Sequence, residues 1–372
     1  MSSRHPYIGL PPRALWSRGV ARRFDPVDVV TSEAPLLRPD DRVASIGSCF
    51  ASNLVPYIEG AGLTYVRTEP PPQQVAMLPE NLGYRDFSAA YGNVYTVRQM
   101  LQLIRRATGV FRPAEDRWHE GDRVIDPFRP GLAYPASSDA EFDAITGDHL
   151  MATREAFETA DVVVVTLGLT EGWQSAVDGA VFPTCPGTVG GTFDPARHLF
   201  RNFTAAEVSD DLRALVGELR DLNPAVRIIV TVSPVPLVAT ASGRHVLEAT
   251  TYSKSVLRVA AGEVVASGPG IEYFPAYELV TGPQAPASFF EADRRSVSAE
   301  AIDQVMGALL AASGLPLAGA DAVAATGDHP TPPEDAGDIG RRIAEAECDE
   351  ALLDTWDSAQ GAPEGEQPPP AS

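Results

Sequence analysis

Short apolar runs alternate along this chain with segments whose apolar residues recur at helical spacing. The apolar runs have the length and the β-branched content of strands. They span residues 42–46, 63–66, 161–167, 227–232 and 271–274. Four consecutive valines dominate the run at 161–167, which is typical of a strand buried on both faces.

Segments with helical spacing stand between and after these runs. We expect helices at residues 48–61, 97–108, 204–222, 250–262 and 298–312. An alternation of strands and helices indicates parallel strands joined by right-handed crossovers. The pattern therefore predicts an α/β fold with a doubly wound, mostly parallel five-stranded sheet of the flavodoxin-like type.

The segments outside this pattern divide the chain into three parts. Residues 1–40 form an irregular lead-in, and residues 41–315 form the α/β domain, with a long insertion at 73–150. The insertion contains turns such as Asp126-Pro-Phe-Arg-Pro130 besides the helix at 97–108. After residue 316 the chain is rich in Ala, Pro and acidic residues, so we expect a partly disordered tail with one short helix near 339–356.

The composition narrows the class of protein. With 372 residues and 44% hydrophobic content, the chain can bury a full core without disulfide bonds. The three cysteines, Cys49, Cys185 and Cys348, lie far apart, so we expect neither a disulfide framework nor a metal site. The chain carries no phosphate-binding glycine loop, and we expect no cofactor.

Charge and hydropathy indicate the surroundings in which the protein acts. The net charge of −21 argues against nucleic-acid binding, because a polyanion repels phosphates. Much of it lies after residue 320, where about 13 acidic residues stand against two basic ones. The first residues lack the apolar segment of a signal peptide, and no stretch approaches the roughly 18 apolar residues that span a bilayer. We therefore expect a cytoplasmic protein without a membrane span.

The residues that follow the strands are the first candidates for chemistry, because ligands of doubly wound sheets bind at the carboxyl ends of the strands. Ser48 follows the first strand, in the turn Gly47-Ser48-Cys49-Phe50-Ala51. A hydroxyl at this strand–helix turn lies beside free N–H groups that stabilise a developing anion. The alternative is that Ser48 only caps the following helix.

This turn and a collinear set of motifs resemble the GSCFA family of the SGNH-hydrolase superfamily. The further motifs are Tyr91-Gly-Asn-Val-Tyr-Thr96, Asp126-Pro-Phe-Arg-Pro130, Thr166-Leu-Gly-Leu-Thr-Glu171, Thr231-Val-Ser-Pro-Val-Pro236, Tyr252-Ser-Lys254 and Tyr273-Phe-Pro-Ala-Tyr-Glu278. The resemblance implies an SGNH-type fold and an esterase, a lipase or an acyltransferase that acts on carbohydrates. It also implies that Ser48 is the nucleophile.

The chain departs from the superfamily pattern at two places. The usual Asp-x-x-His reads Asp293-Arg-Arg-Ser296, so the aspartate remains while the general base is replaced by a serine, which takes up no proton at neutral pH. The usual Gly-x-Asn-Asp reads Gly168-Leu-Thr-Glu171 and lacks the oxyanion-hole asparagine.

Other residues must therefore complete the site. His245, in the segment after the fourth strand, is the first candidate for the base and His198 the second. Lys254 is a third candidate, since a desolvated lysine can accept a proton, although a salt bridge is the alternative for it.

For the oxyanion hole we expect the N–H of Ser48 together with Gly92 and Asn93. Thr170 and Glu171 are candidates for substrate binding, and Arg129 for an anionic group of the substrate. The alternative for Arg129 is an ordinary surface arginine that binds no substrate.

Two functions fit the sequence. The first is a serine-dependent ester hydrolase or acyltransferase that acts on an acylated small molecule or saccharide. The second is a non-catalytic binding or scaffold protein that retains the SGNH fold, and the missing histidine favours it. The acidic tail is a candidate for docking a protein partner.

Overall fold

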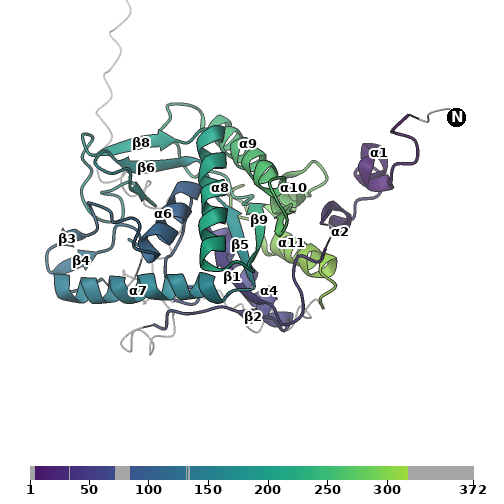
Figure 1. The fold of residues 1–372 in the computed structure, drawn as a ribbon. Helices are drawn as coiled ribbons and strands as arrows, with labels where there is room; N and C mark the ends of the chain where they lie inside the picture. The colour runs from purple at the N-terminus through teal and green to yellow at the C-terminus, as the bar shows by residue number, and fades with distance from the viewer. Residues whose placement is uncertain (1–4, 33, 72–83, 131, 133–134, 317–372) are drawn as a thin grey trace, which may run out of the picture.

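A parallel sheet of five strands lies at the centre of the molecule (Figure 1). The computed structural model describes residues 5–32, 34–71, 84–130, 132 and 135–316. The strands stand in the order β10-β9-β5-β1-β2. Their bounds are Arg42–Ile46 (β1), Thr64–Tyr65 (β2), Val162–Leu167 (β5), Arg227–Val232 (β9) and Ile271–Phe274 (β10). All five predicted strands and the doubly wound topology are confirmed.

β5 is the central strand, and its neighbours hold it in register on both sides. Val43 of β1 pairs with Val162, and Val162 pairs in turn with Arg227 of β9. Every residue of β5 is buried, as expected for a parallel strand covered on both faces.

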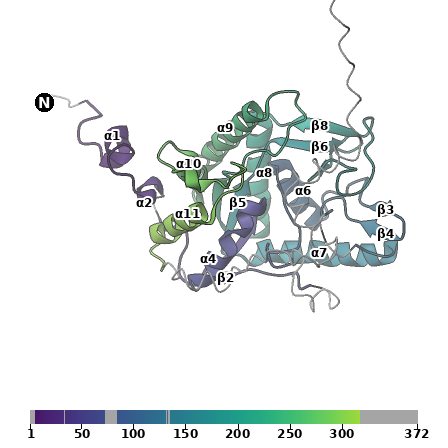
Figure 2. The same ribbon diagram turned by 180° about the vertical axis from the view of Figure 1, so that it is seen from behind.

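Helices cover both faces of the sheet (Figures 1 and 2). One face carries α6 (Val97–Ala107), α7 (Asp139–Thr159), α8 (Ala205–Leu222) and α9 (Val246–Val265). The other face carries α4 (Leu54–Gly60), α10 (Ala276–Thr281) and α11 (Ala299–Ala312).

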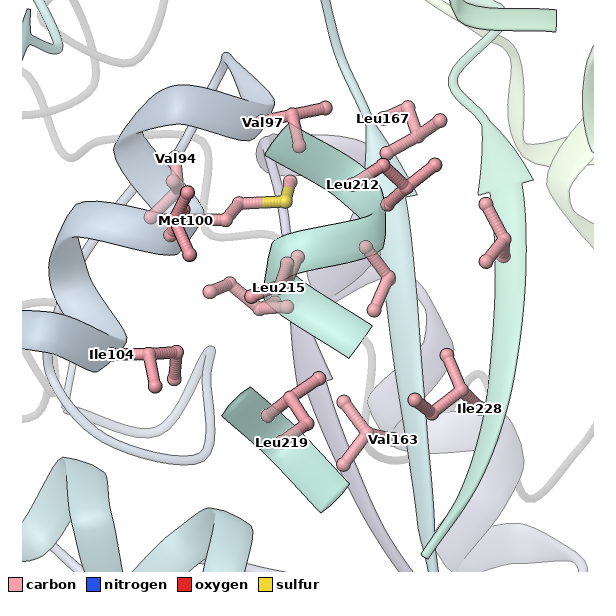
Figure 3. Close-up of a cluster of buried hydrophobic side chains, with 14 of the residues drawn as sticks. Val94, Val97, Met100, Ile104, Val163, Leu167, Leu212, Leu215, Leu219 and Ile228 are labelled. Carbon is pink, nitrogen blue, oxygen red and sulfur yellow. The ribbon is translucent and has the colours of Figure 1, made fainter. Parts of the chain in front are cut away.

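The larger core cluster lies between the sheet and the first of these layers. Figure 3 shows Met100 of α6 and Leu215 of α8 directed toward the side chains of β5 and β9. These apolar residues are almost fully removed from water, which is the main favourable term in folding.

Local capping sequences set where two of the helices begin. Thr96 and Gln99 form a capping box before α6, and Thr204 and Glu207 form another before α8. Each box satisfies backbone N–H groups that the first helical turn leaves without partners. The predicted starts at 97 and 204 therefore agree with the structure to within one residue.

The helix predicted at 48–61 is divided into α3 (Cys49–Ser52) and α4 (Leu54–Gly60). Pro56 explains the break, because it has no N–H to donate to the carbonyl of Ser52 and its ring would clash with that carbonyl. The prediction of one continuous helix over residues 48–61 is therefore wrong.

The insertion has more regular structure than the sequence indicated. It contains the hairpin of β3 (Trp118–Glu120) and β4 (Arg123–Ile125) and most of α7. Ser138 caps α7 by accepting a hydrogen bond from the N–H of Glu141.

Beyond β5 the chain forms a second, antiparallel sheet in the order β7-β6-β8. Its strands are β6 (Glu171–Ser175), β7 (Val181–Phe182) and β8 (His198–Asn202). His198, the second candidate for the base, is the first residue of β8.

Short helices complete the described part of the chain. They are η1 (Pro12–Ala14), α1 (Trp16–Gly19), α2 (Pro26–Val29) and η2 (Ala287–Phe289). The predicted tail helix near 339–356 lies outside the described residues. In the described ranges, no helix is both long and apolar enough to cross a membrane.

Truncation of a leucine in the larger core cluster tests this packing. Leu215→Ala removes a fully buried side chain of α8, and we expect the free energy of unfolding to fall by about 2–5 kcal/mol. Leu247→Ala on α9 is the matched control, because Leu247 is exposed and its loss should change stability by less than about 0.5 kcal/mol. Urea unfolding measures both, and equal losses would contradict the assigned core.

Candidate active site

The turn after β1 holds Ser48 against the end of β5. A Cβ atom at Gly47 would lie 2.7 Å from both the Cβ and the carbonyl oxygen of Thr166, so only glycine fits. This close approach fixes the direction in which the chain leaves β1.

Ser48 occupies the N-cap position of α3, but its hydroxyl makes no capping hydrogen bond. The Ser48 hydroxyl therefore does not cap α3, which was the alternative role for this side chain. The residue is 5% exposed.

Within the described residues, the backbone N–H groups of Ser48 and Gly92 donate no hydrogen bond. Both remain available to a ligand.

The loop of Gly92 and Asn93 lies beside this turn. The N–H of Val94 donates a hydrogen bond of 2.8 Å to the carbonyl oxygen of Gly47, which joins the two segments. Gly92 has φ +65°, a conformation that favours glycine. The structure thus brings together three of the residues predicted from the sequence: Ser48, Gly92 and Asn93.

Lys254 enters the same region from α9. It is 2% exposed, and its Nζ donates a hydrogen bond of 2.6 Å to the carbonyl oxygen of Gly168 at the end of β5. Burial lowers the pKa of the ammonium to about 7; the nearby Cys49 thiol opposes this shift and Arg295 adds to it.

Gly168 follows Thr166 by two residues, and Thr166 is the residue that the Gly47–Ser48 turn approaches, so Lys254 reaches the same edge of the sheet as this turn. The expected alternative, a salt bridge, is absent from the described part of the chain, where no carboxylate pairs with Lys254.

The two histidine candidates already have structural partners. His245 is exposed at the N-cap of α9, where its Nδ1 accepts a hydrogen bond of 3.2 Å from the N–H of Leu247. His198 is buried in β8, with its Nε2 3.2 Å from Glu115 and its Nδ1 3.0 Å from the N–H of Asp194. Among the described residues, neither imidazole has a contact that connects it with Ser48.

Asp293 lies in an exposed turn and holds Ser296 as its partner. Its carboxylate accepts a hydrogen bond of 2.6 Å from the Ser296 hydroxyl, and the N–H groups of Arg295 and Ser296 donate to it at 2.9 Å. These hydrogen bonds, that of Ser296 foremost, lower the pKa of Asp293. The hydroxyl of Ser296 therefore stands where the superfamily pattern has an imidazole.

Thr170 and Glu171 occupy different surroundings. Thr170 is fully buried, and its hydroxyl donates to Asn202 at 2.7 Å, so its contacts are internal. Glu171 accepts a hydrogen bond of 2.8 Å from Thr240, and burial raises the pKa of its carboxyl. Glu171 remains a candidate for substrate binding at the beginning of β6.

Arg129 is engaged inside the protein. Its Nη1 lies 3.2 Å from Oε1 of Glu69, and its Nε lies 2.9 Å from Oδ2 of Asp126. The whole side chain is buried. Two carboxylates already balance its charge, which argues against the binding of a substrate anion, and its burial shows that it is not the surface arginine of the alternative either. In the ranges that the structure describes, no cluster of His, Cys, Asp and Glu could hold a metal ion.

The sequence of the domain matches a known family. The model of the GSCFA family matches residues 42–309. The chain belongs to the GSCFA family. This confirms the resemblance that the Gly47–Ala51 turn indicated, and Ser48 of this GSCFA protein lies within the matched region. No curated protein is similar enough in sequence to match the chain.

Several solved structures are distantly similar to this GSCFA protein. A carbohydrate esterase family 3 protein from Talaromyces cellulolyticus is 11% identical with a TM-score of 0.33, over 72% of this chain and 94% of its own. A family 3 carbohydrate esterase from Clostridium thermocellum is 11% identical with a TM-score of 0.33, over 77% and 98%.

A putative GDSL-like lipase from Parabacteroides merdae ATCC 43184 is 10% identical with a TM-score of 0.32, over 75% and 99% of the two chains. With TM-scores this low, the three likenesses carry no argument about the chemistry of this GSCFA protein.

The lowered pKa of Lys254 predicts a pH-dependent cost of folding. Below about pH 7 the ammonium is charged in both states, so its burial penalises the folded state in full. Between pH 7 and about 10 only the unfolded chain keeps the proton, so this penalty declines as pH rises. We expect the stability of Lys254→Met relative to wild type to fall by about 2–3 kcal/mol from pH 6 to pH 9. Urea unfolding at each pH measures the free energy of unfolding of both proteins. A difference between them that does not change with pH would contradict the lowered pKa of Lys254.

Proposed function

We propose that this protein is a serine-dependent ester hydrolase or acyltransferase that acts on an acylated small molecule or saccharide. Ser48 is the nucleophile and Lys254 is its general base. The observation that carries the proposal is the buried amine of Lys254, which donates a hydrogen bond of 2.6 Å to the carbonyl oxygen of Gly168, just after the end of β5 that the Gly47–Ser48 turn approaches. Burial lowers the pKa of this amine to about 7. A base whose pKa lies near the working pH is well suited to proton transfer.

The reaction begins when the neutral amine of Lys254 takes the proton of the Ser48 hydroxyl. The Ser48 Oγ attacks the carbonyl carbon of the ester and forms a tetrahedral adduct. The bond from carbon to the leaving oxygen then breaks, and the proton on Nζ passes to that oxygen. Water or a sugar hydroxyl attacks the acyl-serine in the same way and releases Ser48.

The negative oxygen of the adduct needs hydrogen-bond donors. The N–H groups of Ser48 and Gly92 donate to no described residue, and the side-chain amide of Asn93 belongs to the residue after Gly92. Together they replace the asparagine that the Gly168–Glu171 segment lacks. Donors that are fixed before the reaction stabilise the developing charge more strongly than water does.

Lys254 is a better candidate for the base than His245. The amine is buried and inclined to lose its proton, whereas the imidazole of His245 is exposed and caps α9. Asp293 binds Ser296 and contacts no imidazole in the part of the chain that the structure describes, so in this proposal it stabilises a turn.

Removal of the Ser48 hydroxyl tests the nucleophile. We expect Ser48→Ala to abolish labelling by a fluorophosphonate probe and to lower p-nitrophenyl acetate turnover by about 10⁴-fold or more. Ser52→Ala is the matched control, because its hydroxyl lies in the same helix but donates to the carbonyl of Cys49. Equal labelling of wild type and Ser48→Ala would refute the proposal.

The pH profile tests the base. The wild-type kcat/KM should rise with pH through about 7, because only the neutral amine accepts a proton. Lys254→Met should remove this rise and lower kcat/KM by about 10²–10⁴-fold, whereas His245→Ala should change it less than tenfold. The reverse result would assign the base to His245.

The second function, a binding protein that retains the fold, has one observation in its favour. Ser296 occupies the position of the usual histidine and is bound to Asp293. If wild type shows neither labelling nor turnover over a range of pH, this function replaces the first.

A further inference from the structure

A buried polar cluster lies on the side of the Gly92–Asn93 loop that faces α6 and α7. His149 of α7 is 0% exposed, and its Nδ1 lies 2.7 Å from a carboxylate oxygen of Glu69. The other carboxylate oxygen of Glu69 contacts Arg129 at 3.2 Å. The function proposed above uses neither Glu69 nor His149.

A cavity of about 20 Å³ separates this cluster from the loop. It is lined by residues of α6, by His149 of α7 and by the loop itself, including Tyr91, Asn93 and Val94. A volume of this size holds one water molecule, provided that polar atoms bind it.

Two polar atoms of this lining are buried without a hydrogen-bond partner among the described residues. They are Nε2 of His149 and Oδ1 of Asn93. An unsatisfied buried acceptor costs about 1–3 kcal/mol, so two of them in the lining of one cavity call for a shared donor.

The protonation of the cluster makes both atoms acceptors. Burial acts to raise the pKa of Glu69, but His149, Arg129 and the N–H of Ala90 together lower it, so Glu69 is a carboxylate. Burial lowers the pKa of His149, so its ring is neutral. The single ring proton then lies on Nδ1, where it is donated to Glu69, and Nε2 is left as an acceptor.

We propose that one ordered water in this cavity donates to Nε2 of His149 and to Oδ1 of Asn93, and that Glu69 and His149 thereby act as positioning residues for the Asn93 amide. A water molecule has two protons, which is the number that these two acceptors need. With Oδ1 held on the cavity side, the Nδ2 group is the part of the amide left for the Ser48 side of the loop.

This inference rests on the proposed function, because Asn93 matters only if an oxyanion forms at Ser48. The hydrogen bond between Val94 N–H and Gly47 carbonyl joins the loop to the nucleophile turn at 2.8 Å. An amide that flips freely presents its oxygen as readily as its donor group. Fixing the amide therefore preorganises the oxyanion hole.

A double-mutant cycle between His149 and Asn93 tests the coupling. We expect His149→Phe to lower kcat about 10- to 100-fold with little change in KM, and Asn93→Ala to lower kcat about 10²-fold. Because His149 acts through Asn93, His149→Phe should have no further effect on kcat in the Asn93→Ala background. Additive losses would overturn the inference.

Two further variants separate positioning from folding. Thr153→Val is the matched control, since Thr153 is also fully buried on α7 and its hydroxyl also lacks a partner among the described residues; it should leave kcat unchanged. His149→Gln keeps a polar group at the cavity and should recover part of the kcat lost in His149→Phe. A His149→Gln variant as slow as His149→Phe, with an unchanged melting temperature, would contradict the role of the acceptor.

The water and the tautomer can be observed without activity. A crystal structure at high resolution should show a water within about 3.2 Å of both acceptors, and ¹⁵N NMR should show His149 protonated at Nδ1. If the water and the Nδ1 proton of His149 are both observed but Ser48 does not react, the proposed function fails and the cluster is purely structural. If Ser48 reacts but the water is absent, only the inference fails.

Discussion

The close approach of Gly47 to Thr166 is the constraint on which the candidate site depends. With no side chain at Gly47, β1 can end against β5 without displacing it, and Ser48 leaves the sheet at its carboxyl edge. The same residue accepts the hydrogen bond of Val94, which brings the Gly92–Asn93 loop to the turn that holds Ser48. A single backbone position thus sets the relative placement of two segments that are far apart in the sequence.

The site contains groups that oppose folding. Lys254 is buried without a carboxylate partner in the described chain, so its charged form is disfavoured and its pKa falls toward neutrality. The same desolvation that weakens the fold makes the amine a base near pH 7. The core on both faces of β5 supplies the stability that allows this arrangement.

The serine that stands in place of the usual histidine keeps a hydrogen bond with the aspartate of the same motif. Asp293 keeps a partner three residues on, but that partner is the hydroxyl of Ser296. The turn is retained, but a serine hydroxyl takes up no proton at neutral pH. In the proposed function Lys254 of α9 is the base instead, and α9 packs on the opposite face of the sheet from α11, the helix that follows Asp293.

The sequence by itself determined the five strands, the capped starts of α6 and α8, and Ser48 at the first strand–helix turn. These follow from local periodicity and capping, which act between residues close in the chain. Only the tertiary structure decided the rest. His245 and Lys254 were both candidates for the base, and their difference in burial arises from how α9 packs on the sheet. The pairing of Glu69 with His149 joins segments of the fold that no local pattern connects, because burial and pKa depend on neighbours brought together by the whole chain.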